Sequence, residues 1–446
     1  MRRVLFFCLV SVLSCKTAKR PALADSPPLD TGEDHCYEPG ELSLTPQDPA
    51  SDQHVVLLLD DGIASDHEMF KDKVIAKYTL VCALSGTEDE MDSLEGFKAQ
   101  AQERLKAGEK VLFGQKCCLR KGIDPLPIQI DPKDLDQRDQ WNQLIQTNQA
   151  IPLSLNDLFS RIKPNIKDYH GTVTGSVIAT NNPKVAFVLV QANNSRKFYN
   201  GCNVVQKNYE KGLANLQDSE IQKILNENAE LSEWKLIDEL AKKHHVTLMN
   251  KSRSTSTRFI DSILGRQCVE PFRNTISAYY DLKAGFTEKI ARRMGIFYDQ
   301  QNFLTLQSAG NDSLQIDSTK DSLDCLLSPK HLMIGSYDAN GMKSYFSNFG
   351  QCVNIYNVGS SLVGTNPFGF LVVVSGTSFS APLLARYISM QFPASMPALD
   401  IQTELKNRLN PNGYLPFDAS FPYGQYTGIS NLGLSEGAFS PVIVED

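Results

Sequence analysis

The sequence predicts an α/β fold of three layers, with a mostly parallel central sheet and helices on both of its faces. Apolar runs of strand length recur along the chain, and the first is HVVLLLD at 54–60. A run without polar alternation is typical of a strand that is covered on both faces. Helical patterns separate several of these runs, and strands that alternate with helices favour a parallel sheet.

The predicted elements follow in chain order. Further strands are predicted at 184–192, 246–250, 303–310, 331–337, 353–359 and 370–376. Residues 232–243 predict an amphipathic helix, because one face carries Trp234, Ile237, Leu240 and Ala241. A second helix is predicted at 276–295, before the strand at 303–310. In a sheet of this kind, binding and chemistry lie at the carboxyl ends of the strands.

Two long segments interrupt the alternation of strands and helices. The first covers about 71–168 and includes a polar helical pattern at 93–108, and the second covers about 193–231. Both are interpreted as surface insertions, because a rigid core tolerates additional residues where a loop leaves it.

The first 15 residues predict export from the cell. MRRVLFFCLVSVLSC has a positive start and an apolar run that is too short to span a membrane. Its end, VLSC, resembles a bacterial lipoprotein signal, which implies a lipid on Cys15; simple cleavage near Cys15 is the alternative. Residues 16–52 are rich in Pro, Asp, Ser and Thr, and they predict a flexible linker. The expected location is the bacterial cell envelope, in the periplasm or lipid-anchored to the membrane, or outside the cell.

Charge and cysteine content exclude some classes of function. The net charge of −7 provides no basic surface for nucleic acid, so no nucleic-acid partner is expected. No C-x-x-C pair or zinc-type histidine spacing is present, which argues against a metal site built on cysteine. In an oxidising compartment the cysteines beyond the leader can form disulfides, but the sequence does not select the pairing. They are Cys36, Cys82, Cys117, Cys118, Cys202, Cys268, Cys325 and Cys352.

Four polar residues lie where predicted strands end or predicted helices begin: Asp60, His170, Asn311 and Ser378. Taken singly, each has an ordinary structural explanation as a turn residue or a helix cap. Taken together, they are the residue types that acyl transfer requires. A serine nucleophile needs a base, an imidazole base needs an orienting acid, and the oxyanion needs donors such as an Asn amide and a backbone N–H.

The motifs around these residues resemble those of the subtilisin-like serine protease family (peptidase S8). GTSFSAP at 376–382 resembles the family's GTSxSAP motif, and LLLDDGI at 57–63 resembles its Asp motif in the Asp-Asp-Gly form. HGTVTGSVIA at 170–179 is similar to HGTHVAGxIA, from which it departs at residues 173–176. SAGN at 308–311 resembles the oxyanion motif, and His67 matches a histidine that is commonly structural in the family.

Further segments extend the resemblance over residues 54–435. They are YFSNFG at 345–350, YNVGSSL at 356–362 and a late surface helix at 401–413. The two insertions have no counterpart. On this basis we expect residues 53–437 to form a subtilisin-like peptidase domain and 438–446 to be a C-terminal tail.

The resemblance implies an exported serine-type endopeptidase that cuts peptide or protein substrates through a covalent acyl-enzyme. Ser378 would be the nucleophile, His170 the general base and Asp60 its orienting acid, while Asn311 would donate to the oxyanion. The implied substrate-binding residues are Ser252, Gly310, Gly376 and Thr377. The chemistry needs no cofactor. The family often binds structural Ca²⁺, for which 85–92 and 310–324 are acidic loops, but solvated loop charge is the preferred interpretation of both.

Two other functions remain open at this stage. The first is a catalytically degenerate relative that acts as a binding or scaffold lipoprotein. The second is a serine hydrolase on another α/β fold, such as an esterase. Such an enzyme requires a G-x-S-x-G motif and catalytic residues in the chain order Ser, Asp, His. GLSEG at 433–437 matches G-x-S-x-G, but no histidine follows it, so the order Ser, Asp, His is absent. The related sedolisins use Glu and Asp in place of His, and the HGT and SAGN motifs argue against them.

Overall fold

The computed structural model describes residues 36–37, 39–42, 52–84, 115–126, 130–147, 149, 158, 169–192, 232–253 and 294–416, except residues 320, 323, 327 and 339. All of them belong to one unit of the chain, Cys36–Asp446. The predicted signal at 1–15, the helical pattern at 93–108 and the insertion at 193–231 lie outside the described residues.

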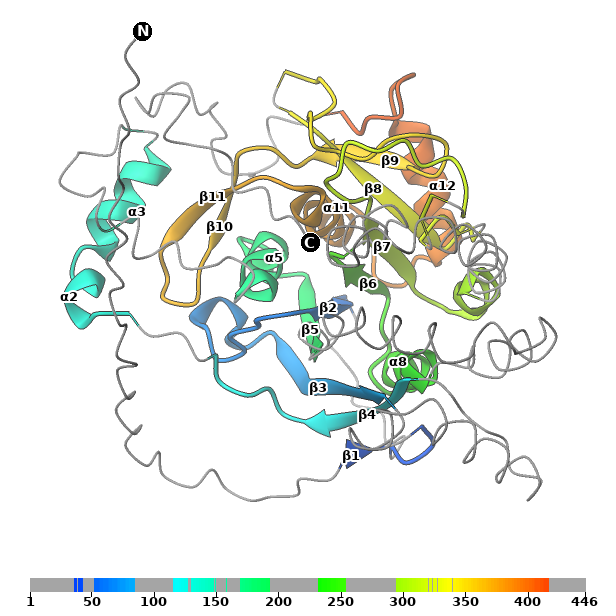
Figure 1. Cartoon of the computed structure of the whole chain (residues 1–446), viewed down its shortest axis with the longest axis horizontal. Helices are drawn as coiled ribbons and strands as arrows, with labels where there is room; N and C mark the ends of the chain where they lie inside the picture. Colours follow the sequence, from blue (N-terminus) through cyan, green and yellow to red (C-terminus); the bar gives the residue numbers. More distant parts are fainter. Residues whose placement is uncertain are drawn as a thin grey trace, which may run out of the picture. The chain divides into compact units, whose positions relative to one another are not determined.

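The main sheet has the strand order β1-β4-β3-β5-β2-β6-β7-β8-β9 within the described residues, and Figure 1 shows this arrangement. Its strands are β1 Cys36–Tyr37, β2 His54–Asp60, β3 Val74–Leu84, β4 Gln115–Lys121, β5 Val185–Ala192, β6 Leu248–Lys251, β7 Leu304–Ser308, β8 His331–Tyr337 and β9 Ile355–Val358. Neighbouring strands from β3 to β9 are parallel, whereas β4 is antiparallel to both β3 and β1. The prediction of a mostly parallel central sheet is confirmed.

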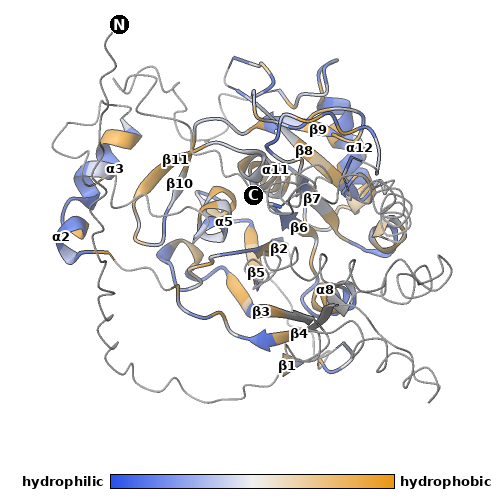
Figure 2. Ribbon diagram, in the orientation of Figure 1, coloured by the Kyte–Doolittle hydropathy of each residue, from blue (hydrophilic) through white to orange (hydrophobic). Residues whose placement is uncertain are grey.

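The central strand β2 shows why the fold has three layers. Val56 and Leu58 belong to one apolar cluster, while Val55, Leu57 and Leu59 belong to another, because successive side chains of a strand point to opposite faces. The first cluster contains residues of α5 (His170–Ala179), α11 (Thr377–Gln391) and α12 (Ala398–Arg408). The second contains residues of α8 (Ser232–Lys243) and of the helical residues 294–300. Figure 2 shows apolar residues along much of β3 and β5.

The predicted strand at 370–376 is not a strand of the main sheet. It forms β11 (Leu371–Val374), which pairs in antiparallel register with β10 (Leu362–Thr365) in a separate sheet. Its apolar side chains pack beside α3 (Arg138–Gln146), and Trp141 Nε1 donates to the Leu371 carbonyl at 2.8 Å. The predicted strand is confirmed at Leu371–Val374, but it belongs to the hairpin and not to the main sheet, because an apolar run does not distinguish a central strand from a hairpin that packs on a helix.

Two segments that were predicted to lie outside the core are attached to it. Residues 74–84, within the first predicted insertion, form β3, and Tyr78 and Leu80 are buried there. The start of the insertion is therefore part of the main sheet and not a surface addition. In the predicted linker, Cys36 is held by the Cys36–Cys118 disulfide, and Leu42 is buried. Composition alone could not reveal this cross-link.

Helix boundaries agree with the prediction where the apolar face is well defined. The predicted helix at 232–243 is confirmed as α8. Residues 294–300 are helical, so the helix predicted at 276–295 ends later than expected, and its residues 276–293 lie outside the described part. The late helix is α12, Ala398–Arg408, and not 401–413. It ends before Asn410, because a residue that precedes proline disfavours helical geometry.

Short helices complete the described elements: the 3₁₀ helix η1 (Glu68–Phe70) and α2 (Pro132–Leu135). No helix in the described part of the chain is long and apolar enough to cross a membrane.

Candidate active site

The ends of three adjacent parallel strands lie at the same edge of the main sheet. Asp60 is the last residue of β2, Ser252 follows β6 directly, and Asn311 follows β7 by three residues. The strands β2, β6 and β7 are neighbours in that order, so their carboxyl ends present these residues together. Two helices, α5 and α11, begin with His170 and with Thr377-Ser378.

Asp60 and His170 form a buried hydrogen bond. His170 Nδ1 lies 2.7 Å from Asp60 Oδ1, and the two residues are 4% and 1% exposed, respectively. The Asp60 carboxylate also accepts from the Asp61 N–H at 2.8 Å and from Thr174 Oγ1 at 2.9 Å. A carboxylate that accepts from Nδ1 holds the imidazole proton there, and this leaves Nε2 as the basic nitrogen.

The residues after His170 join the start of α5 to the loop after β2. The Gly171 N–H donates to the Asp61 carbonyl at 2.6 Å, and the Thr172 hydroxyl donates to the Gly62 carbonyl at 2.9 Å. A Cβ on Gly171 would lie 2.6 Å from the Asp61 carbonyl oxygen, which is closer than atoms approach. Glycine is therefore required here, and the HGT sequence fixes His170 against Asp60.

Ser378 is the second residue of α11 and is fully buried. Its Oγ donates to the Ser252 carbonyl at 3.0 Å. The ring of the next residue, Phe379, lies 5.6 Å from the His170 ring, measured between centroids, so the starts of α5 and α11 are adjacent. The start of α11 therefore lies near His170, and the Ser378 hydroxyl proton is directed at the Ser252 carbonyl.

Asn311 is held in one orientation by Thr377. Its Oδ1 accepts from the Thr377 N–H at 2.9 Å and from Thr377 Oγ1 at 3.0 Å, and that hydroxyl in turn accepts from the Gly310 N–H at 3.0 Å. The amide nitrogen Nδ2 lies 3.4 Å from the place that a Cβ on Gly376 would take. With its oxygen occupied by Thr377, the Asn311 amide presents its N–H groups beside Gly376 and the start of α11.

The eight residues that the sequence assigns to the site thus come together from distant parts of the chain. They lie at the ends of β2, β6 and β7 and at the starts of α5 and α11. Gly310 and Gly376 have φ angles of 97° and 154°, a region that favours glycine, so small residues are needed where the backbone turns beside Ser378.

Sequence reasoning missed two contacts at this site. Thr174 donates to Asp60, and its position four residues after His170 on a helix was an available signal. Arg253 Nη2 forms an ion pair with Asp61 Oδ2. No sequence pattern indicated this pair, because it depends on the adjacency of β2 and β6.

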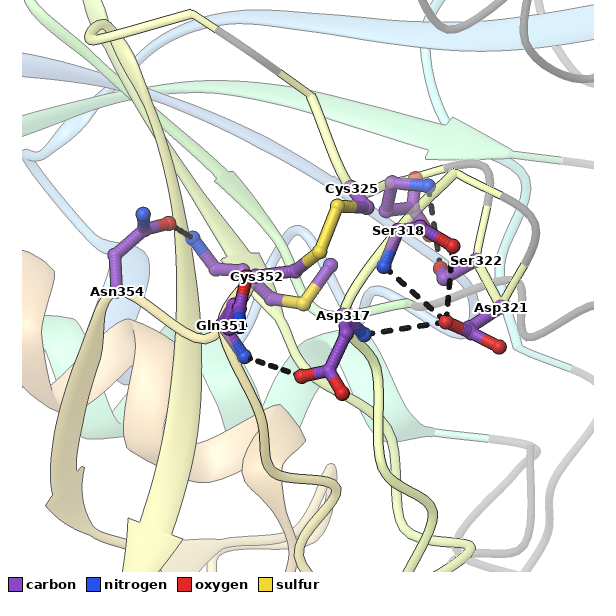
Figure 3. The surroundings of a disulfide bond; sticks show 10 residues. Asp317, Ser318, Asp321, Ser322, Cys325, Gln351, Cys352 and Asn354 are labelled. Carbon is purple, nitrogen blue, oxygen red and sulfur yellow. Dashed lines mark hydrogen bonds between the residues drawn. A yellow bond between two sulfur atoms is a disulfide. The ribbon is translucent and has the colours of Figure 1, made fainter.

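The acidic loop at 310–324 uses its carboxylates to bind backbone N–H groups of the loop itself and of Gln351, as Figure 3 shows around the Cys325–Cys352 disulfide. Asp317 Oδ1 accepts from the Gln351 N–H at 2.8 Å. Asp321 Oδ2 accepts from the Ser318 N–H at 3.1 Å. In the described part of the chain no group of three or more His, Cys, Asp or Glu residues is placed to hold a metal ion. The other acidic loop, 85–92, lies outside the described residues.

His67 stabilises the loop that follows the Asp60 motif. Its Nδ1 accepts from the Met69 N–H at 3.2 Å at the start of η1, and burial lowers the pKa of the imidazole. It also lines a cavity of about 310 Å³ between this loop and residues 123–126 and 367–368. Asp60, His170 and Ser378 do not line this cavity.

Comparison with known proteins gives short matches to curated relatives. The chain is 33% identical to the alkaline serine protease ver112 of Corniculantispora psalliotae over 78 residues, which are 18% of this chain and 19% of that protein. It is 28% identical to the cuticle-degrading protease of Metarhizium anisopliae over 128 residues, which are 28% and 32% of the two chains. The chain thus spans less than a third of the length of these relatives.

Among solved structures, the chain is similar to a lanthipeptide protease, with 14% identity, a TM-score of 0.40, and coverage of 80% of this chain and 81% of that one. A cold-adapted subtilisin-like serine proteinase matches with 14% identity, a TM-score of 0.38, and coverage of 82% and 85%. Similarity at these scores carries no argument by itself. A sequence model described as the subtilase family matches residues 51–424. Because this match covers most of the chain, the chain belongs to the subtilase family.

Proposed function

We propose that the chain is an exported serine endopeptidase that hydrolyses peptide bonds with Ser378, His170 and Asp60. The observation that carries the proposal is the buried 2.7 Å hydrogen bond between Asp60 and His170, at the start of a helix adjacent to that of Ser378. The bond fixes the His170 ring near the start of the helix that carries Ser378, and a base held by a carboxylate in this way can activate a serine nucleophile.

In the first step, the Ser378 hydroxyl gives its proton to His170 Nε2 while Oγ attacks the carbonyl carbon of the substrate. The proton that now points at the Ser252 carbonyl must first be redirected toward His170. Asp60 remains ionised and stabilises the imidazolium that forms. Because Asp60 is buried and holds three hydrogen bonds, it needs little reorganisation when the positive charge appears.

The negative charge on the substrate oxygen needs donors. Asn311 Nδ2 and the Ser378 N–H are the two groups proposed here, and Thr377 keeps the Asn311 amide in the required orientation. Collapse of the tetrahedral intermediate breaks the C–N bond, and His170 gives its proton to the leaving amine. A water molecule then attacks the acyl carbon and gives a proton to His170. His170 passes this proton to Ser378 Oγ as the ester C–O bond breaks, which releases the second product and restores the serine.

The substrate is proposed to be a peptide or protein whose backbone lies along residues 250–253. Ser252 places its carbonyl 3.0 Å from Ser378 Oγ, so a chain bound beside Ser252 has its own carbonyl near the nucleophile. Gly310, Gly376 and Thr377 form the opposite side. Side chains and backbone groups perform every step of this chemistry, and we assign no cofactor to it.

Export is part of the proposal and has support beyond the leader sequence. The Cys36–Cys118 and Cys325–Cys352 disulfides are typical of proteins that fold in an oxidising compartment. Membrane attachment through a lipidated Cys15 is proposed on the sequence VLSC alone. A Cys15→Ala variant that still fractionates with the membrane would exclude the lipid anchor.

The test of the catalytic proposal is labelling by a fluorophosphonate, which forms a covalent bond with an activated serine. The wild type is expected to be labelled, and Ser378→Ala is not. Ser380→Ala is the matched control, because Ser380 is buried on the same helix as Ser378 and should leave labelling unchanged. Absence of labelling in the folded, mature wild type would favour the degenerate scaffold lipoprotein. Internal cleavage of an unfolded protein, located by mass spectrometry, tests the endopeptidase assignment.

A further inference from the structure

The second oxygen of the Asp60 carboxylate has a donor of its own. Thr174 Oγ1 lies 2.9 Å from Asp60 Oδ2 and 3.2 Å from the Gly171 carbonyl. A hydroxyl has one proton, and a charged acceptor at the shorter distance forms the stronger bond. Thr174 is fully buried, so water does not compete for this contact.

One helix therefore holds both oxygens of the carboxylate. His170 and Thr174 are four residues apart on α5, so they share a helix face. His170 Nδ1 binds Oδ1, and the Thr174 hydroxyl binds Oδ2. A carboxylate held through one oxygen can rotate about its Cβ–Cγ bond. Contacts at both oxygens fix the plane of the group, and with it the direction of the Asp60–His170 hydrogen bond.

This donor is a property of this chain and not of the motif to which the segment is similar. In HGTHVAGxIA the residue four positions after the histidine is valine, whereas this chain has Thr174. Valine has nearly the same shape as threonine but no hydroxyl, so it cannot donate. The substitution exchanges an apolar contact beneath the catalytic pair for a hydrogen bond to its acid.

We propose that Thr174 is a positioning residue for catalysis, whose hydroxyl fixes the orientation of Asp60 and takes up part of its negative charge. The inference rests on the proposed function. It implies that the rate of the chemical step depends on the hydroxyl of Thr174, while substrate affinity does not, because Thr174 is fully buried and its hydroxyl contacts Asp60 and the Gly171 carbonyl.

The charged groups around the catalytic pair define the expected pH effect. Asp60 on β2 faces His170 directly, and the Asp61–Arg253 pair joins the ends of β2 and β6 with opposite charges that compensate. The first nine residues of α11, Thr377–Ala385, include no charged side chain. Without the Thr174 hydroxyl, more of the Asp60 charge acts on His170, so the imidazolium is favoured and the acidic limb of the pH–rate profile moves to higher pH.

Two substitutions separate the hydroxyl from the methyl group of Thr174. Thr174→Val keeps the branched shape and loses the donor, whereas Thr174→Ser keeps the donor and loses the methyl group. We expect Thr174→Val to lower kcat about tenfold with KM unchanged and to shift the acidic limb upward. Thr174→Ser should leave both kcat and the position of the acidic limb near their wild-type values. The opposite order, with Ser impaired and Val normal, would show that Thr174 only packs, and would overturn the proposal.

A readout independent of turnover separates this inference from the proposed function. In a Ser378→Ala background, the titration of the His170 ring followed by NMR should have a higher midpoint when Thr174 is changed to Val. Equal midpoints in the two proteins would contradict the inference, even if the wild type is an active protease. If the wild type neither cleaves peptides nor is labelled by the fluorophosphonate, the proposed function fails. The titration of His170 still decides the role of Thr174 in that case.

Coupling to Asp60 provides the last check. In an Asp60→Asn background the carboxylate is absent, so Thr174→Val should cause no further loss of activity. An undiminished tenfold loss in that background would mean that Thr174 acts through another group. Thermal melting of each variant shows whether a loss of rate is a loss of folded protein.

Discussion

The two halves of the candidate active site differ in how completely they are assembled. In the acid–base half, Asp60 already holds His170 at 2.7 Å, and the loop after β2 is bonded to the start of α5. In the nucleophile half, the oxyanion donor is oriented by Thr377, but the Ser378 hydroxyl is directed at the Ser252 carbonyl. The Asp60–His170 contact is thus already formed, whereas the proposed mechanism requires the Ser378 hydroxyl to turn toward His170.

The difference has a physical reason. The Asp60–His170 bond is buried and involves a charge, so its loss would leave an unsatisfied carboxylate in the interior, which is costly. A serine hydroxyl rotates freely and finds an equally good acceptor in a backbone carbonyl. Catalytic hydrogen bonds of this second type commonly tighten when substrate binds. We expect the following substitutions to distinguish the halves, in decreasing order of effect.

The largest loss is expected from the two residues that exchange the proton. Ser378→Ala and His170→Ala should each lower kcat by a factor on the order of 10⁶, which is the loss known for the serine and the histidine of subtilisin. The double variant should be no worse than either single one, since the two residues act as a unit. The rate of peptide hydrolysis at saturating substrate measures kcat of each variant. If the losses in the double variant were additive in free energy, Ser378 and His170 would act independently, and the two halves would not work as a unit.

Asp60→Asn tests the preassembled half. The amide keeps the shape of the side chain but removes the charge that stabilises the imidazolium. The expected loss in kcat is about 10⁴, again the scale known for subtilisin. A loss in kcat as small as tenfold would show that Asp60 orients the His170 ring but does not stabilise the imidazolium by its charge.

Asn311→Ala removes the side-chain donor of the nucleophile half. The expected loss is about 10² to 10³ in kcat with little change in KM, because the donor acts on charge that develops in the transition state. Thr377→Ser should retain most of the activity, since the hydroxyl that holds the Asn311 amide is kept. If Asn311→Ala were as inactive as Ser378→Ala, the assignment of Asn311 to the oxyanion would be wrong.

Arg253→Ala is expected to have the smallest effect, through charge alone. Its loss leaves the Asp61 carboxylate uncompensated next to Asp60, which favours the charged imidazole. The acidic limb of the pH–rate profile should move to higher pH, while the rate at alkaline pH changes by less than about threefold. The matched control is Arg120→Ala, because the Arg120 side chain is also 30% exposed and pairs with Asp124 away from the site. An identical shift in the control would point to a general effect of net charge.

Local sequence patterns correctly predicted a strand that is buried along its whole length and a helix with one apolar face. The apolar run at 54–60 is β2, and the amphipathic pattern at 232–243 is α8. The same reasoning predicted the strand at 370–376 but not its place in the β10–β11 hairpin, and it missed β3 of the main sheet at 74–84. In both cases the residues are apolar enough for a strand, but the identity of the neighbouring strand depends on contacts that are far apart in sequence.

The sequence by itself determined the residue types of the candidate site and their order, because a nucleophile, a base, an acid and an oxyanion donor each require particular functional groups in recognisable local motifs. Only the tertiary structure decided how these groups are held. The Thr174 bond to Asp60, the Thr377 bonds to Asn311 and the Arg253 pair with Asp61 depend on directions and distances across strands and helices. Hydrogen bonds and ion pairs are short-ranged and directional, so they exist only after the fold has brought their partners together.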